Sequence, residues 1–555
     1  MLRLPLLIAA LFVALTAAAQ HDFYADRTFT HADSLRGSLR PERTAFDVTY
    51  YGLHLDLLPD TKSLRGYVDI GYQMVNPASR IQLDLYPNLQ IDRIEQEGRP
   101  LDYTRELGAV FVDLGRTQGK NSIHRMRVHY RGKPTEAQNA PWDGGFVWKT
   151  DKKDRPWIGV ACEGDGASLW WPNKDHLSDE PDSVLISVSV PDPLMVVANG
   201  NLRSQEKEGK GRTRYEWFVS YPINNYDVSI NVANYVHFND IYQAADGDTL
   251  ALDYYVLDYN LDRARKQFRQ VPGMLAAYEH YLGKYPFWDD GFALIETPYL
   301  GMEHQSGIAY GNQYMRGYLG GMIPPDMDWD YIIIHESGHE YFGNSIGVAD
   351  LAEMWIHESF TTYLEALYVE HVYNAADARR YLAGQRPYIE NKEPIIGPPG
   401  VNWDKQRQSS DHYFKGAWVL HTLRSAIGND DLWFSILHDF YQDHQRSLIV
   451  SKDFFDYVAR RTKQPWTAAF FEQYLYYPGI PTLQIRSSGS GKDREVRYRY
   501  QADVADFAMP IDLVVDRRTH RIKPTTTAWQ TIKVGAGALG VAPDRFLVHL
   551  DMEED

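Results

Sequence analysis

Two histidines four residues apart, His335 and His339, are the side chains in this sequence best placed for chemistry. Because an α-helix turns about every 3.6 residues, histidines at this spacing leave the same face of a helix and can bind one metal ion. Glu358, nineteen residues after His339, adds a carboxylate. Two imidazoles and one carboxylate form the ligand set of a catalytic zinc ion with an open coordination position. Glu336, beside the histidine pair, could then accept a proton from a water molecule at the metal.

The segments that must hold these residues read as helices. The apolar run 331–334 precedes His335 and can bury a helix predicted over 330–345, and residues 351–370 predict a second helix that carries Glu358. Two histidines and a glutamate in this five-residue pattern also occur by chance in proteins where they bind no metal. A third ligand at a suitable distance favours a metal site over that alternative.

The composition is that of an ordinary globular protein and argues against some classes of function. Of 555 residues, 44% are hydrophobic and 24% are charged, which does not favour disorder. The length suggests about three or four domains. The formal net charge of −17 argues against nucleic acid as a partner, because phosphates require a basic surface. A soluble acidic surface is the simpler interpretation of that charge, although it would also attract a cationic peptide.

The first twenty residues predict a secretory signal peptide. Arg3 precedes an apolar run from Leu4, and small residues follow up to a cleavage position near Ala19 or Gln20. The run is short for a bilayer, so a retained membrane anchor is the less favoured alternative. We expect an exported protein, periplasmic or extracellular, with no membrane insertion after signal cleavage.

Cys162 is the only cysteine in the sequence, so no disulfide can form within the chain. A nucleophilic thiol is conceivable at this position. A small buried side chain is the favoured interpretation.

The periodicity of apolar residues predicts a multidomain α+β fold. From about residue 40 to 245, apolar and polar residues alternate, as at Leu53, Leu55 and Leu57, which indicates an N-terminal antiparallel β domain. Helical spacing then predicts a mainly helical domain, and alternation returns in a small C-terminal β sandwich. The predicted boundaries are 1–20 for the signal peptide, 21–246 for the β domain, 247–477 for the helical domain and 478–555 for the sandwich.

Within the middle region the spacing is regular enough to give boundaries for single elements. Pro272 either kinks a helix that runs from about 268 to 282 or begins a second one. A strand-like stretch covers 293–309. Further helices are predicted over 330–345, 355–370, 414–426, 430–443 and 451–475.

Three further motifs stand in order around the histidine pair. Gly301–Gln305 reads GMEHQ in the strand-like stretch, and Tyr413–Gly416 reads YFKG at the start of a predicted helix. In the β domain, Ala161–Glu163 reads ACE ahead of Trp170–Asp175. Together with the zinc motif, these residues resemble the aminopeptidase N family of gluzincin zinc metallopeptidases. Order and spacing match that family from about residue 45 to residue 483.

The resemblance implies a thermolysin-like catalytic domain and a zinc-dependent aminopeptidase that hydrolyses the N-terminal peptide bond of peptides. It implies one zinc ion held by His335, His339 and Glu358. Glu336 would be the general base, and Tyr413 would stabilise the oxyanion.

The resemblance also implies which residues meet the substrate. Glu303 and Glu163 would bind the α-ammonium group of a free N-terminus, beside Gly301 and Met302. Glu365 matches a position that could orient a ligand histidine. The expected partners are therefore peptides with a free N-terminus, and the oligomeric state is left open.

The sequence departs from the usual family pattern at four positions. His304 stands where the family has Asn, Glu340 and Tyr341 where it has Gln and Trp, and Ser359 where it has Gly. None of these changes removes a ligand, the base or the tyrosine. They put in question the shape of the substrate subsites rather than the reaction. The chain also resembles a short form without the large C-terminal helical domain of many members, which predicts a more open site that admits longer peptides.

Two alternative functions remain open at this point. A catalytically silent peptide-binding protein could use the same scaffold, although the presence of the ligands, base, tyrosine and amine anchor disfavours it. A relative that hydrolyses an epoxide at the same zinc would need a lipid-sized apolar channel.

Overall fold

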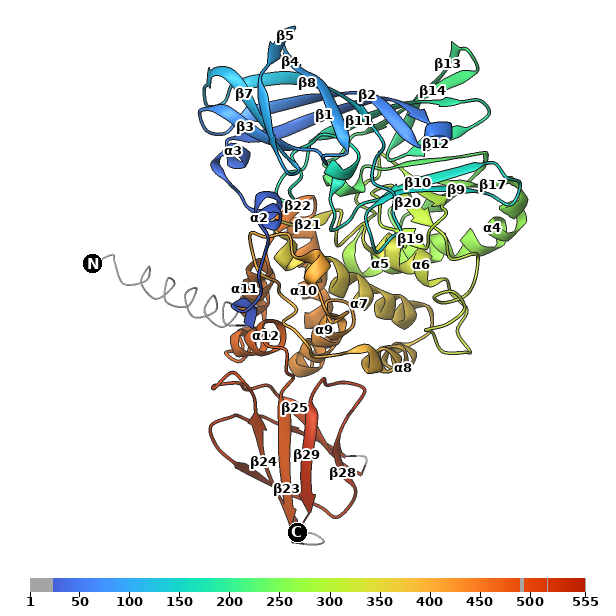
Figure 1. The fold of residues 1–555 in the computed structure, drawn as a ribbon. Coiled ribbons are helices and arrows are strands. Elements are labelled where there is room, and N and C mark those ends of the chain that lie inside the picture. Colours follow the sequence, from blue (N-terminus) through green and yellow to red (C-terminus); the bar gives the residue numbers. More distant parts are fainter. Residues whose placement is uncertain (1–22, 490–493, 517, 555) are drawn as a thin grey trace.

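The computed structural model describes residues 23–489, 494–516 and 518–554. The predicted signal peptide, residues 1–20, lies outside these ranges. Along the described chain, a region of β-sheets, a mainly helical region and a final group of strands follow one another, from blue to red in Figure 1. The predicted multidomain α+β fold is confirmed.

The N-terminal region is built on an eight-stranded sheet with the order β13-β14-β11-β1-β2-β8-β4-β5. The alternation predicted at Leu53, Leu55 and Leu57 lies on β1, where these side chains are at most 1% exposed. Neighbouring strands are antiparallel except β1 and β11, which are parallel. The strands are β1 Phe46–Leu58, β2 Ser63–Met74, β4 Leu89–Gln96, β5 Arg99–Leu101, β8 Ile123–Gly132, β11 Ser183–Pro191, β13 Asn201–Gly209 and β14 Arg212–Val219.

Two smaller sheets complete this region. β10 ends at Ala161, so Cys162 and Glu163 begin the loop that leaves the second of them. Cys162 is buried, as predicted. The first sheet contains β3 Ala78–Asp84, β6 Tyr103–Glu106 and β7 Ala109–Gln118; the second contains β9 Gly145–Thr150, β10 Pro156–Ala161, β12 Met195–Ala198 and β15 Ile230–Ala233. Two short helices, α2 His31–Gly37 and α3 Pro41–Thr44, precede β1.

A five-stranded sheet with the order β16-β17-β18-β20-β19 connects the β region to the helices. β16 and β17 pair along their whole length, so the predicted boundary between 246 and 247 falls in the turn of one hairpin inside this sheet. The predicted strand-like stretch 293–309 forms short strands rather than one long strand. The bounds are β16 Tyr235–Gln243, β17 Thr249–Leu257, β18 Phe292–Glu296, β19 Gly301–Met302 and β20 Gly307–Tyr310.

The middle region is mainly helical, as predicted. Pro272 lies in the first turn of α5, so it begins a helix rather than kinking a longer one. The single helix predicted over 451–475 is wrong: Lys463 takes the left-handed φ of 54° and ends α11 before α12 begins. In the described part of the chain, no helix combines the length and hydrophobicity that a membrane span requires. The helices are α4 Leu261–Gln267, α5 Val271–Leu282, α6 Tyr331–Gly338, α7 Trp355–Val372, α8 Ala375–Gln385, α9 Phe414–Ile427, α10 Asp430–His444, α11 Ser451–Thr462 and α12 Thr467–Tyr476.

The helix that carries His335 is shorter than the predicted range 330–345, since α6 ends at Gly338. His339 keeps helical backbone angles as the residue that caps this end. Beyond it, the backbone N–H groups of residues 344–346 bond to carbonyls five residues earlier, which makes a turn wider than that of an α-helix. This wide turn leads into β21 Ile346–Val348, which pairs with β22 Ser447–Ile449.

The strands from Thr482 onward form two sheets, with the orders β27-β24-β23-β29 and β26-β25-β28. One hydrophobic core extends from the helices into these strands, whereas most of the N-terminal β region has a core of its own. The strands are β23 Thr482–Ser488, β24 Arg494–Gln501, β25 Ile511–Val515, β26 Arg518–Ile522, β27 Gln530–Val534, β28 Leu539–Val541 and β29 His549–Glu554.

Candidate metal centre

His335 lies on α6, and Asp330 fixes where that helix begins. The Asp330 carboxylate accepts hydrogen bonds from the backbone N–H groups of Ile332 and Ile333, at 3.1 and 3.4 Å. The apolar residues 331–334 are at most 6% exposed, so the helix is buried as predicted. Asp330 is not among the residues predicted from the sequence, although an aspartate directly before an apolar run is a common signal for a helix N-cap.

The structure brings His335, His339 and Glu358 together in one buried cluster. The Nε2 atoms of the two histidines are 3.2 Å apart. The Oε2 atom of Glu358, on the first turn of α7, lies 3.5 Å from the first and 3.4 Å from the second. The three side chains offer ligand atoms within 4.8 Å of one another, which is the geometry of a candidate metal site.

The hydrogen bonds around the two imidazoles leave a place that a cation fits. His335 Nδ1 lies 2.6 Å from Glu365, and His339 Nδ1 lies 3.1 Å from the carbonyl oxygen of Phe342. When both Nδ1 atoms donate, both Nε2 atoms direct lone pairs toward the same point. Glu358 Oε2 faces that point, is buried and has no hydrogen-bond partner among the described residues. Imidazole nitrogen and carboxylate oxygen are ligands that zinc accepts, so the residues fit this ion.

Glu365 holds the first of these histidines. Its carboxylate is fully buried and accepts hydrogen bonds from His335 Nδ1 at 2.6 Å, from the Tyr381 hydroxyl at 2.5 Å and from the Gln385 amide at 3.0 Å. This is the contact expected of a residue that orients a ligand histidine and fixes its tautomer. The orienting role itself stays a prediction, which the following variant tests.

Glu365→Gln should lower the affinity for zinc about 10- to 100-fold. Glutamine fills the same space, but its NH₂ group cannot accept the hydrogen bonds that a second carboxylate oxygen accepts. Competition against a fluorescent zinc chelator measures the affinity. Tyr381→Phe, which removes only one of the three bonds, is the milder control. Equal affinity in Glu365→Gln and the wild type would contradict the orienting role.

Glu336 also lies on α6 and lines the cavity next to Gly301 of β19. A Cβ atom on Gly301 would lie 2.6 Å from Glu336 Oε1 and 2.7 Å from Ile332 Cγ2, so a residue larger than glycine would displace them. Burial raises the pKa of Glu336 to about 8. A carboxylate with a pKa near neutrality is suited to accept a proton and to return it.

The two carboxylates predicted to bind an α-ammonium group reach this cavity from different parts of the chain. Glu303 follows β19, is 3% exposed and accepts a hydrogen bond from the Tyr226 hydroxyl at 3.2 Å. Glu163 follows β10, and Met302 lies beside Glu303; both line the same cavity. Burial raises the pKa of Glu163, and the nearby charge of Glu303 raises it further. An ammonium group between them would relieve this repulsion.

Tyr413 immediately precedes α9, and its ring lies over the ring of His335 with centroids 6.1 Å apart. Burial raises the pKa of the Tyr413 hydroxyl, and the charges of Glu358 and Glu163 raise it further. The hydroxyl therefore stays protonated and can donate a hydrogen bond, as an oxyanion donor must.

Ser359, one of the departures from the family pattern, is accommodated by a glycine on the facing helix. A Cβ atom on Gly416 of α9 would lie only 1.6 Å from Ser359 Oγ, so α7 and α9 approach here because Gly416 has no side chain. Ser359 Oγ donates a hydrogen bond to the carbonyl of His412 at 2.6 Å. The Ser359 hydroxyl group therefore holds the backbone immediately before Tyr413.

The side chains at the other three departures, His304, Glu340 and Tyr341, are also buried. None of them is among the described residues that line the cavity. Glu340 accepts hydrogen bonds from the Tyr285 hydroxyl at 2.6 Å and the Ser306 backbone N–H at 2.9 Å. His304 is fully buried, and burial lowers its pKa to about 3, so its ring is neutral. These positions support the packing behind the site rather than its substrate-facing wall.

The predicted site residues other than Glu365 line one cavity of about 610 Å³, whereas Glu365 lies outside this lining and contacts His335. Several other side chains in the cavity wall could not be predicted from the sequence, because they lie on loops and short 3₁₀ turns without periodicity. Among these are the aromatic residues Trp142, Tyr318 and Tyr388 and the charged residues Asp404 and Arg407. Another cavity of about 610 Å³ lies between α7, α8, α9 and the C-terminal strands, and it shares no lining residue with the first.

Residues 270–474 match the peptidase family M1 domain. The leucyl aminopeptidase of Saccharolobus solfataricus is 20% identical over 483 residues, which is 84% of this chain and 58% of that protein. Human aminopeptidase B is 23% identical over 316 residues, which is 53% of this chain and 45% of that protein. The chain therefore spans less than two thirds of the length of these curated relatives.

Among solved structures, an M1 zinc metallopeptidase mutant from Deinococcus radiodurans, bound to a Tyr-Ser-Ala substrate, matches with a TM-score of 0.63 and 20% identity. The match covers 77% of this chain and 93% of that chain. The structure of the M1 zinc metallopeptidase from the same organism gives a TM-score of 0.63 over 77% of this chain and 92% of its own. These matches show a shared fold.

Proposed function

The chain belongs to peptidase family M1, in line with its resemblance to the aminopeptidase N family, and we propose that it is a zinc-dependent aminopeptidase. It removes the N-terminal residue of peptides by hydrolysis. The observation that carries the proposal is the buried cluster of His335, His339 and Glu358 with two further carboxylates, Glu303 and Glu163, in the same cavity. A ligand set alone fits any metallopeptidase, whereas the added carboxylates fit a substrate with a free α-ammonium group.

We assign one zinc ion to the cluster of two histidines and Glu358. When bound there, zinc polarises the substrate carbonyl and makes a water molecule more acidic. Glu336 takes the proton from the attacking water and delivers it to the amine that leaves. Its position against Gly301 keeps the carboxylate directed into the cavity.

Tyr413, directly before α9, supports the same step. Its protonated hydroxyl donates a hydrogen bond to the carbonyl oxygen as negative charge develops there. The stacking of its ring on that of His335, one of the proposed zinc ligands, supports this role.

Glu303 and Glu163 turn a peptide hydrolase into an aminopeptidase. Both bind the α-ammonium group of the substrate, and Tyr226 fixes the Glu303 carboxylate. A peptide with a blocked N-terminus would leave these carboxylates without a cation in a buried site, which disfavours its binding. Export of the protein remains a prediction from residues 1–20, which lie outside the described ranges.

The test is hydrolysis of aminoacyl-p-nitroanilides beside their N-acetylated forms, before and after treatment with a chelator. We expect the zinc-loaded wild type to cleave the free-amine substrates and not the acetylated ones. Glu303→Ala should lower kcat/KM for free-amine substrates at least about 100-fold, because the ammonium group loses a charged partner. Glu370→Ala removes a carboxylate that pairs with Arg424 outside the cavity, and it should keep wild-type specificity.

Each other result points to a different function. Equal cleavage of acetylated substrates would make the protein an endopeptidase and would remove the assigned roles of Glu303 and Glu163. Absence of cleavage by zinc-loaded protein would favour a silent peptide-binding protein or an epoxide hydrolase.

A further inference from the structure

Glu163 lies on a short loop, Cys162–Gly166, whose shape depends on contacts from outside it. Within the loop, two backbone N–H groups bond to earlier carbonyls of the same loop, at 2.7 and 2.6 Å. The carbonyls of Gly164 and Asp165 have their partners elsewhere in the chain. Gly164 and Gly166 have φ of 71° and 84°, a region that glycine adopts readily, so the loop has little stiffness of its own.

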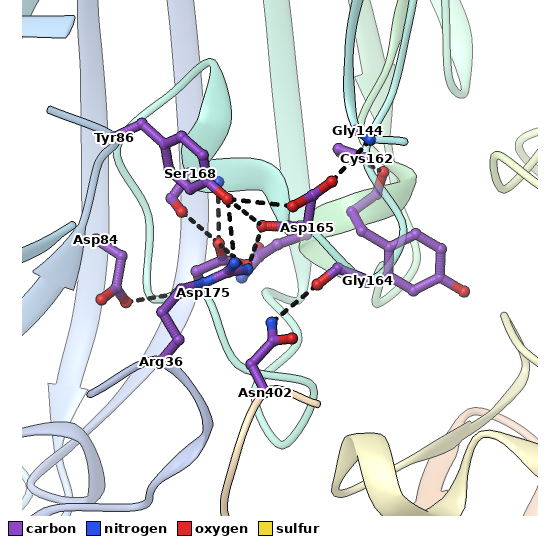
Figure 2. A network of polar contacts seen from close by, with 12 residues as sticks. Arg36, Asp84, Tyr86, Gly144, Cys162, Gly164, Asp165, Ser168, Asp175 and Asn402 are labelled. Atoms are coloured by element: carbon purple, nitrogen blue, oxygen red, sulfur yellow. Dashed lines mark hydrogen bonds and ion pairs between the residues drawn. The ribbon is translucent and has the colours of Figure 1, made fainter. Parts of the chain in front are cut away.

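Arg36 supplies a donor from a segment more than a hundred residues earlier. Its guanidinium group donates hydrogen bonds to the Asp165 carbonyl and, at 3.1 Å, to the Tyr86 hydroxyl. The Tyr86 hydroxyl also donates to the Asp165 carbonyl, at 3.2 Å. Arg36 lies 3.7 Å from the Asp175 carboxylate. Figure 2 shows Arg36, Tyr86 and Asp175 gathered around Asp165.

α2 holds Arg36 in this position. Thr30 caps the helix, and the Arg36 carbonyl accepts a hydrogen bond from Arg43, a fully buried side chain that pairs with Asp84 at 2.8 Å. Gly37, at the end of α2, lies so close to Val401 that a Cβ atom there would be 2.2 Å from the Val401 carbonyl carbon. These contacts hold the backbone of α2 in place, so the Arg36 side chain extends toward the Glu163 loop from a fixed position.

A second donor links the same loop to the cavity wall. The Asn402 side chain donates to the Gly164 carbonyl at 2.9 Å, and its backbone N–H donates to the Asp33 carbonyl of α2 at 3.0 Å. Asp404, two residues on, lines the cavity, and its carboxylate lies against Gly164. α2, the Glu163 loop and this part of the cavity wall therefore form one connected unit.

We propose that Arg36 is a positioning residue for Glu163: it holds the Asp165 carbonyl, and with it the loop, so that the Glu163 carboxylate faces the ammonium group of the substrate. This inference rests on the proposed function, because it requires Glu163 to bind an ammonium group. Without Arg36, the Asp165 carbonyl keeps only the Tyr86 hydroxyl as a donor, and Asp175 loses its cationic neighbour. The loop can then shift around the Asp165 carboxylate, which the Gly144 backbone N–H and Lys405 still hold at 2.8 and 2.6 Å.

The experiment is a double-mutant cycle on binding of L-leucine, which has a free α-ammonium group and no amide bond to hydrolyse. Binding to the zinc-loaded full chain is measured by calorimetry for wild type, Arg36→Ala, Glu163→Ala and the double variant. Arg36→Ala should raise Kd about tenfold, within the range expected for a small misplacement of a binding group. Because Arg36 acts through Glu163, the double variant should bind no more weakly than Glu163→Ala. Arg36→Lys, which keeps a donor and the charge, should restore part of the affinity.

Two further variants separate positioning from general stability. Arg424 has a side chain 10% exposed that pairs with Glu370 and lines the other cavity, so Arg424→Ala should lower Tm without changing Kd. Tyr86→Phe removes the second donor to the Asp165 carbonyl and should raise Kd in the same direction as Arg36→Ala, which serves if Arg36→Ala does not fold.

Several outcomes would overturn the inference. These are a Kd of folded Arg36→Ala within about twofold of wild type, losses that add fully in the double variant, or wild type that does not bind L-leucine. Because the cycle measures binding rather than turnover, a chain that binds L-leucine but cleaves no substrate would contradict the proposed function and leave the role of Arg36 standing.

Discussion

Glu336→Gln should lower the turnover number for a free-amine aminoacyl-p-nitroanilide by about 100- to 10,000-fold, the range that a general base contributes. Glutamine has nearly the same shape and can occupy the space beside Gly301, but it cannot accept a proton. The metal content should stay at the wild-type level, because Glu336 is not in the cluster of His335, His339 and Glu358. Turnover and zinc per chain, measured on one preparation, test both statements.

Glu340 provides the matched control for this variant. It lies four residues further along the chain and is fully buried, but its carboxylate binds Tyr285 and Ser306 behind the site. Glu340→Gln should therefore lower thermal stability and keep kcat close to that of wild type. If Glu336→Gln kept turnover within about tenfold of wild type, another group would have to take the proton.

Glu358→Ala should remove the bound metal and with it all hydrolysis. The variant keeps the two imidazoles but loses the only carboxylate oxygen placed near both Nε2 atoms in the His335, His339 and Glu358 cluster. We expect zinc affinity to fall by more than the roughly 100-fold limit for a residue that only orients a ligand. Chelation followed by zinc should restore the wild type and leave the variant inactive at the same zinc concentration.

His357, the residue before Glu358 on α7, is the control for this second variant. It is 1% exposed, and burial lowers its pKa to about 3, so its ring is neutral, and it is not part of the ligand cluster. His357→Asn should keep full zinc content in the fraction that folds. Full zinc content in Glu358→Ala would instead show that another side chain supplies the third ligand. Glu303 would be the first candidate, since it already lies in a second potential ligand group with Glu336 and His339.

The residues that could be predicted from the sequence are those whose geometry follows from spacing along the chain. His335 and His339 are one helical turn apart, and the apolar run before them requires a buried helix, so their shared face follows from local geometry. The alternation at Leu53, Leu55 and Leu57 predicts a strand for the same reason. Glu303, Glu163 and Tyr413 required the resemblance to a family, because nothing in their local sequence directs them to one cavity.

The residues that could not be predicted depend on contacts between distant segments. Tyr226 lies 77 residues from Glu303, and Arg36 lies 129 residues from Asp165, and all four contribute to the network around the proposed ammonium site. Loops such as Cys162–Gly166 carry no periodicity, so only the folded chain shows which donors they find. The predicted end of the helix over 330–345 is wrong for a related reason. A backbone turn such as the one after Gly338 ends a helix without changing the apolar pattern.

The C-terminal strands and the helices of the middle region share one hydrophobic core, so we infer that they unfold as one cooperative unit. Leu483 and Phe546 belong to the same buried cluster as Trp418 of α9. Lys415, two residues after Tyr413, donates to the Pro478 carbonyl at 2.7 Å. Local unfolding of these strands would therefore release α9, which begins directly after Tyr413, the proposed oxyanion donor. The boundary near residue 477 stays a prediction, and by this inference it would divide the chain by its type of secondary structure and not into parts that unfold separately.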